Sequence, residues 1–157
     1  MAVIQTTRFG QVKVSNKSIL HMSEGMLGFD ECKRYVLLED KPDTPLKWLQ
    51  AVDDPGLAFI VVNPLDFVPG YDFELSDDDA RALELESADQ AVVLTTVSID
   101  QDENEVTTNL LGPVVINSVT LAGKQVVLQD ERYGTRYLIG KNTDAEADAP
   151  VAAAEAA

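Results

Sequence analysis

The chain has 157 residues, of which 45% are hydrophobic, and this length suits a single domain with a core of useful size. Its 27 acidic and 12 basic residues give a formal net charge of −15, which disfavours direct binding to DNA or RNA because such a surface repels the phosphate backbone. The same charge would steer a basic protein partner toward the chain, although acidity also serves simply to keep a protein soluble.

Neither a disulfide nor a membrane segment is expected. The chain contains one cysteine, Cys32, so an intramolecular disulfide is excluded. The first residues lack the basic start and apolar run of a signal peptide, and no apolar stretch approaches the ~20 residues of a membrane span. We therefore expect a cytoplasmic protein that does not associate with membranes.

Short extended segments separated by turn residues dominate the chain. Strands are predicted at residues 2–15 (a hairpin that turns near residues 9–11), 18–22, 35–39, 46–52, 57–62, 91–100, 124–128 and 135–139. Many short strands with few helices favour an all-β fold, a small antiparallel barrel-like structure or a sandwich. A sheet closed on itself would also remove exposed strand edges.

Two of these strands have informative patterns. Residues 57–62 are apolar on both faces, which predicts a central strand that Pro64 ends. Residues 91–100 alternate, which predicts that the odd positions face the core: Val93, Thr95, Val97 and Ile99.

One helix and one low-complexity tail complete the organisation. Ser76 is a good N-cap, and three aspartates follow it in the first turn, so a short helix is predicted to end near Leu85. Residues 142–157 are rich in Ala and acidic residues and predict a disordered tail after a domain at residues 1–141.

The sequence offers little that points to catalysis or to a cofactor. His21 has no second histidine as a partner, and neither it nor Cys32 has the neighbours of a metal site or a nucleophile. The acidic runs at Asp53-Asp54 and at residues 77–79 lack the alternating spacing of a calcium loop and are interpreted as a turn and a helix cap. No metal or cofactor is expected, and a binding protein is favoured over an enzyme.

The loops on either side of the strand at residues 57–62 suit an interface better. They combine acidic, amide and aromatic groups, and we expect the loops at residues 53–56 and 63–71 to emerge near the same end of the fold. For the loop aromatics Phe67 and Tyr71, contact with a partner and packing remain equal alternatives.

A second apolar segment, residues 108–117 (TNLLGPVVIN), contains no nucleophile, no metal ligand and no phosphate loop. Pro113 forbids a regular helix there and interrupts a continuous strand ladder. Because Asn side chains satisfy backbone groups where a ladder is interrupted, Asn109, Pro113 and Asn117 are predicted to shape a strand-turn-strand element.

Several segments, taken in order, resemble the FliW family of flagellar assembly factors over about residues 2–140. The similar segments are residues 6–14 (TTRFGQVKV), 24–29 (EGMLGF), 34–38 (RYVLL), 48–59 (WLQAVDDPGLAF), 63–64 with Tyr71, 108–117 and 123–125 (GKQ). The family often has proline between the glycines that match Gly25 and Gly28, whereas this chain has Met-Leu. The acidic tail is not part of the shared pattern.

The resemblance implies a non-enzymatic regulator with a small β-barrel fold. Such a protein would bind the translational regulator CsrA, relieve its repression of flagellin mRNA, and bind flagellin as a competing partner. The alternative is a small β-barrel ligand-binding module or a hydrolase of unknown substrate. Partner-binding residues are expected among Asp53, Asp54, Phe59, Asn63, Pro64, Phe67 and Tyr71.

Overall fold

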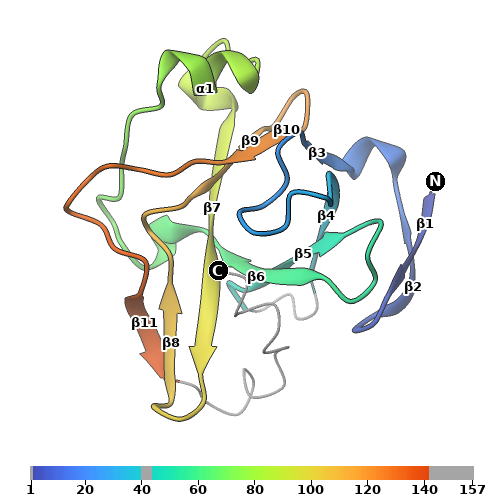
Figure 1. Ribbon diagram of the computed structural model, residues 1–157, viewed down its shortest axis with the longest axis horizontal. Helices are drawn as coiled ribbons and strands as arrows, with labels where there is room; N and C mark the ends of the chain where they lie inside the picture. Colours follow the sequence, from blue (N-terminus) through green and yellow to red (C-terminus); the bar gives the residue numbers. More distant parts are fainter. Residues whose placement is uncertain (1, 40–43, 142–157) are drawn as a thin grey trace.

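The computed structural model of the chain describes residues 2–39 and 44–141, and the predicted acidic tail at residues 142–157 lies outside them. The described residues are mostly strands with one short helix, α1 (Asp77–Ala82) (Figure 1). The strands are β1 (Ala2–Thr6), β2 (Gly10–Val14), β3 (Leu20–Met22), β4 (Arg34–Leu38), β5 (Lys47–Ala51), β6 (Ala58–Val62), β7 (Ala91–Asp100), β8 (Glu105–Thr108), β9 (Val114–Asn117), β10 (Ala122–Gln125) and β11 (Tyr137–Lys141).

Seven of these strands close into a barrel, so the all-β, barrel-like prediction is confirmed. The order is β7-β6-β5-β4-β3-β10-β9, and β9 pairs with β7 to complete the ring. The pairings are antiparallel except that of β10 with β3, which is parallel. Gly123 permits this close approach, because a Cβ there would lie 2.5 Å from the sulfur of Met22.

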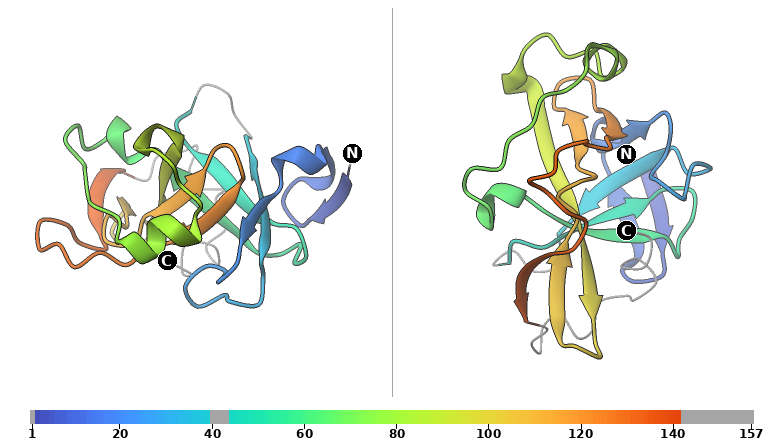
Figure 2. Two further views of the ribbon diagram at one scale, coloured as in Figure 1. Left: turned by 90° about the horizontal axis from the view of Figure 1, so that it is seen from above. Right: turned by 60° about the vertical axis from the view of Figure 1, so that its left-hand side comes forward.

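Strand β7 is the longest element and belongs to two sheets. Its first half pairs with β9, and its second half extends past the barrel to pair with β8, which in turn pairs with β11 (Figures 1 and 2). The predicted alternation along β7 is therefore wrong in part. Leu94 and Thr96 are also buried, since the middle of the strand is covered on both faces, whereas Val93 is only partly buried.

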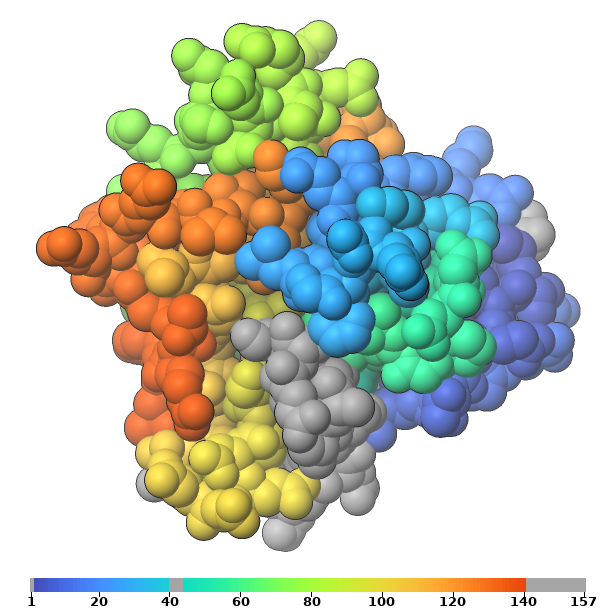
Figure 3. All heavy atoms as spheres, in the orientation of Figure 1, coloured from blue at the N-terminus to red at the C-terminus, as the bar shows by residue number. Residues whose placement is uncertain are grey.

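The core is divided among four clusters. The barrel interior contains Tyr35, Leu49 and Phe59, all at most 1% exposed, and a second cluster on the outer face of the sheet surrounds Trp48. A third cluster lies under the β1–β2 hairpin, and a fourth lies under α1 around Val115. The hairpin and α1 lie on different flanks of the molecule (Figures 2 and 3).

Some predicted boundaries differ from the structure. The helix ends at Ala82, not near Leu85, because Leu83 caps it and Glu84 has a φ of +55° that no helix continues. Strand β8 was not expected, since its polar threonines carry no apolar alternation, yet two of them are buried where β7 and β8 meet. No helix within residues 2–39 and 44–141 is long and apolar enough to cross a membrane.

Candidate functional site

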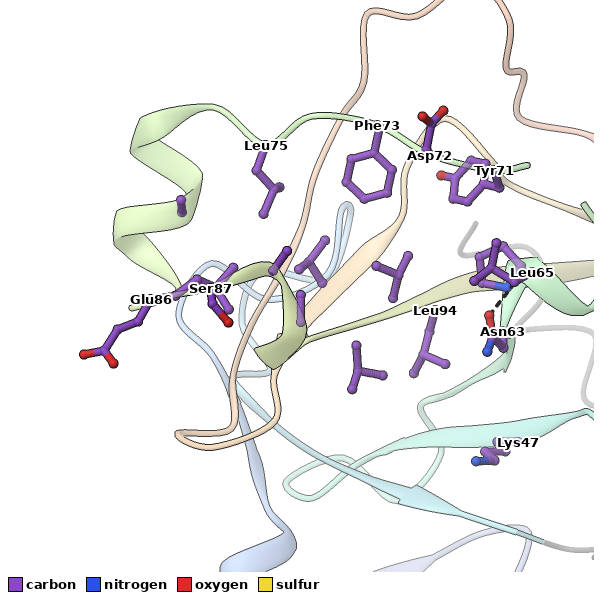
Figure 4. A pocket seen from close by; sticks show the side chains of 18 residues that line it. Lys47, Asn63, Leu65, Tyr71, Asp72, Phe73, Leu75, Glu86, Ser87 and Leu94 are labelled. Atoms are coloured by element: carbon purple, nitrogen blue, oxygen red, sulfur yellow. Dashed lines mark hydrogen bonds between the residues drawn. The ribbon is translucent and has the colours of Figure 1, made fainter. Parts of the chain in front are cut away.

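An apolar groove of about 750 Å³ lies beside the first half of β7 (Figure 4). The segment at residues 71–75 and helix α1 form one wall, β7 forms the other, and the 3₁₀ turn η2 (Pro64–Asp66) closes one end. It is lined by Lys47, Asn63, Pro64, Leu65, Tyr71, Asp72, Phe73, Leu75, Ala80, Leu85, Glu86, Ser87, Ala88, Ala91, Val92, Val93, Leu94 and Val115. Its volume is in the range of ligand and peptide sites.

The wall at residues 71–75 results from a simple alternation. Tyr71, Phe73 and Leu75 are buried or partly buried and face the groove, whereas the intervening Asp72 and Glu74 are exposed. In an extended segment, successive side chains point to opposite sides. The wall therefore presents apolar groups inward and carboxylates toward solvent.

Tyr71 anchors this wall to the rest of the fold. Its hydroxyl donates a 2.6 Å hydrogen bond to the carbonyl of Leu110, and its ring packs edge-on against Tyr133 at 4.7 Å between centroids. Burial raises the pKa of the Tyr71 hydroxyl above its ordinary value. The prediction left packing and contact open for this residue. At 7% exposure its side chain is packed, with its ring at the groove.

Helix α1 is held by a buried end and a charged end. The Asn117 Nδ2 donates to the carbonyls of Leu83 (2.9 Å) and Glu84 (3.2 Å), just after the helix. In the first turn, Asp79 accepts a 2.6 Å hydrogen bond from the Lys124 ammonium, which also lies 3.1 Å from Glu24. The hydrogen bonds to Asp79 and Glu24 raise the pKa of Lys124.

The remaining residues of the 108–117 segment shape the turn beneath this wall. The Asn109 Oδ1 accepts from the backbone N–H groups of Leu111 and Gly112, each at 3.0 Å, and Pro113 is buried. The Asn117 Oδ1 accepts from two further N–H groups in the following turn, those of Val119 and Thr120. These contacts support the structural role expected for Asn109, Pro113 and Asn117, and they also connect that role to the groove.

The expected partner-binding residues separate into distinct places. Asn63 and Pro64 line the groove, and the Asn63 side chain caps η2 by accepting a 3.0 Å hydrogen bond from Leu65 N–H. Phe67 is half-buried and packs against the Trp48 cluster. Phe59 is 1% exposed inside the barrel, so the expectation of a surface contact there is wrong: its strand is covered on both faces.

Asp53 and Asp54 lie at the other end of β6. Asp53 forms an exposed ion pair with Arg34, which lowers the pKa of its carboxyl group, and Asp54 accepts a hydrogen bond from Gly56 N–H within the turn. The expectation that the two loops emerge near the same end of the fold is therefore wrong, because they lie at opposite ends of β6. An extended strand of five residues separates its ends by about 13–17 Å.

Charge around the groove is mainly negative. Glu74 and Glu86 are exposed, and within the described part of the chain neither pairs with a cation. The Asp72 carboxylate forms an ion pair with the Arg132 guanidinium, 3.3 Å away. Lys47 is the one cation among the lining residues, at the end near Asn63, and it lies 3.7 Å from Glu39.

The described residues that line the groove include neither histidine nor cysteine. Among residues 2–39 and 44–141, no group of three or more His, Cys, Asp or Glu side chains is placed to hold a metal ion. His21 is exposed. Burial, followed by the carboxylates of Asp54 and Asp53, raises the pKa of the Cys32 thiol, which disfavours the reactive thiolate.

Sequence reasoning missed most of the groove. The alternation at residues 71–75 was a usable signal for an extended wall with one apolar face. Val92, which is 42% exposed, lines the groove because the neighbouring strand β6 stops short of it, and no local sequence pattern predicts where β6 stops.

Comparisons with known proteins agree with this fold. The family model described as FliW protein matches residues 3–139. The chain is 42% identical to the flagellar assembly factor FliW of Geotalea uraniireducens (strain Rf4), over 85% of this chain and 82% of that protein. It is 40% identical to the flagellar assembly factor FliW of Syntrophus aciditrophicus (strain SB), over 90% and 89%.

A solved structure gives the same result in three dimensions. The crystal structure of a flagellar assembly factor FliW matches with a TM-score of 0.81 at 30% sequence identity, covering 88% of this chain and 96% of that one. Fold, sequence and the order of motifs agree, and the chain belongs to the FliW family.

Proposed function

We propose that this chain is a non-catalytic regulator of flagellar assembly that works in the cytoplasm by binding other proteins. It binds CsrA and relieves its repression of flagellin mRNA, and it binds flagellin as a competing partner. Relatives 34–42% identical to the chain are described as flagellar assembly factors, which supports the first part.

The observation that carries the proposal is the groove itself. Its walls are held by buried hydrogen bonds from Tyr71 and Asn117, so it is formed before any partner arrives. A preformed apolar groove with a charged rim is suited to recognising a protein segment, since little ordering is needed on binding. The net charge of −15 suits a basic partner such as an RNA-binding regulator.

Titration of the purified full chain with CsrA, with flagellin and with both together tests this function. We expect a complex with each protein, and we expect flagellin to displace CsrA. The association rate with CsrA should fall as salt is raised, because screening weakens steering between opposite charges. Binding to neither protein would contradict the function, and a stable ternary complex would contradict the competition.

A further inference from the structure

One edge of β7 carries backbone groups that no described strand uses. Strand β9 pairs with residues 91–94 on one edge, whereas β6 pairs with the other edge only at Thr95 and Thr96. Beyond Val62 the chain turns away, because Asn63 caps η2 and Pro64 lacks an N–H to donate. The sheet therefore has a gap beside the first half of β7.

The hydrogen-bonding pattern between β7 and β9 shows which backbone N–H and C=O groups of β7 face this gap. The N–H of Ser118 donates to the carbonyl of Gln90, so Gln90 is a hydrogen-bonded partner of the β9 side. In an antiparallel ladder such residues alternate, so Val92 and Leu94 also direct their backbone groups to β9. Ala91 and Val93 direct theirs to the opposite edge, toward the gap.

Three of these groups have no partner among the described residues. The Ala91 N–H is bonded to the carbonyl of Ala88, which leaves the Ala91 carbonyl and both backbone groups of Val93. The groove lies along this edge, since it is lined by four consecutive residues of β7 rather than by alternate ones (Figure 4). A groove over one face of a strand would contact every second residue.

We infer that the β7 edge receives an extended segment of a protein partner, which adds a strand to the sheet where β6 has turned away. The inference rests on the proposed protein-binding function and specifies how the groove is used. Main-chain hydrogen bonds to Val93 and Ala91 give the strand its register, and pockets for alternate side chains select the sequence.

The lining defines the chemistry of that segment. Side chains on one face of the added strand would pack against Phe73 and Leu75, so they must be apolar. The Glu86 carboxylate, at the end of the groove away from Lys47, favours a basic residue there, whereas Lys47 disfavours one at the other end (Figure 4). The partner segment is therefore about four residues long, alternates apolar and polar residues, and is basic at one end.

Residue-resolved amide hydrogen exchange by NMR tests the pairing directly, with full-length CsrA and flagellin as partners. We expect the Val93 amide to exchange rapidly in the free chain and at least about tenfold more slowly in a complex, because it becomes hydrogen-bonded. The amides of Val92 and Leu94 should be slow in both states and serve as internal controls.

A pair of matched variants tests the contact. Val92→Lys places a like-charged group beside the basic segment and should weaken binding about tenfold or more without changing the melting temperature, since Val92 is 42% exposed. Val127→Lys, at a position 60% exposed and outside the groove, should leave binding unchanged.

A synthetic probe separates this inference from the identity of the partners. An end-capped hexapeptide alternating Val and Lys should shift the Val93 resonance, and the Val and Glu counterpart should bind about tenfold more weakly or not at all. If the peptide occupies the β7 edge while CsrA and flagellin do not bind, the proposed function fails and the inference stands.

Three outcomes would overturn the inference. In the first, CsrA or flagellin binds but leaves Val93 exchange unchanged. In the second, neither protein nor the Val and Lys peptide protects Val93. In the third, Val93 is already protected in the free chain, which would mean that another part of the chain or, if protection rises with concentration, a second copy fills the gap.

Discussion

The two ends of β6 show how differently one strand can be finished. At the Asp53 end, a tight turn satisfies its own polar groups: Asp54 bonds Gly56 locally, and Asp53 pairs with Arg34 in solvent. At the Asn63 end, the chain leaves the sheet, and an apolar groove opens beside β7. The side-chain bonds at the first end are exposed to solvent, and the Thr7 N–H also donates to the carbonyl of Pro55 there, whereas the second end depends on buried anchors from far along the chain.

Those anchors give a structural role to the segment at residues 108–117, which contains no nucleophile and no metal ligand. Asn117 reaches back 34 residues to Leu83, and Tyr71 reaches forward 39 residues to Leu110. Polar groups buried in this way cost free energy when a partner is removed. The comparison predicts large effects for changes at the groove end and small ones at the Asp53 end.

The largest effect is expected from Asn117→Ala. Asn117 is 1% exposed and serves two carbonyls and two N–H groups, so its loss should lower the free energy of unfolding by roughly 2–4 kcal/mol. Urea unfolding measures this change. Asn16→Ala, at an exposed position, should be nearly neutral, and equal stability of the two variants would refute the anchoring role.

Tyr71→Phe should have the next largest effect. It removes one hydroxyl and leaves the buried carbonyl of Leu110 without its partner, at a cost of about 1–2 kcal/mol. Tyr137→Phe is the matched control, because Tyr137 is 43% exposed. Thermal melts of both should show a lower Tm only for Tyr71→Phe. A shift of similar size in both would mean that the bond to Leu110 contributes little.

Lys124→Met tests the charged anchor of α1 and should have a smaller effect. The ion pair with Asp79 is partly buried, so its loss should cost about 0.5–1.5 kcal/mol and should matter less at high salt. The raised pKa of Lys124 means that this contribution is present below its unfolded value near 10.4 and lost as pH rises through the folded one. Stability that is unaffected by salt in both proteins would contradict the electrostatic account.

Asp53→Asn should have the smallest effect. Its pair with Arg34 is about half-exposed, so after solvent screening it contributes at most about 0.5 kcal/mol. Because the carboxyl pKa is lowered, this contribution is present above the unfolded pKa near 3.9 and disappears as pH falls. Unfolding measured at pH 7 and pH 3 checks this, and a loss as large as that of Asn117→Ala would reverse the comparison.

The sequence was sufficient for what local pattern controls. Alternation and turn residues located β7 to its ends, and Ser76 identified the start of α1 because an N-cap acts within one turn. The same reasoning predicted that Asn109 and Asn117 bond backbone groups, since Asn side chains readily accept hydrogen bonds from nearby backbone N–H groups.

The groove was beyond that reasoning for physical reasons. Phe59 and Phe67 are both aromatic residues close to the same loop. Phe59 is buried only because the barrel closes around it, whereas Phe67 is partly buried against the Trp48 cluster. The free edge of β7 exists because β6 ends at Val62, two residues before Pro64, while β7 continues to Ala91, and this depends on the register of the two strands.

Site-specific photo-crosslinking at the two ends of β6 tests the central claim most directly. A benzoylphenylalanine placed at Leu65, which is 55% exposed at the groove, and another at the exposed Asp54 are compared in the presence of CsrA or flagellin. We predict a crosslink from position 65 and none from position 54. A crosslink from position 54 alone would place the binding face at the other end of the strand and would contradict the account.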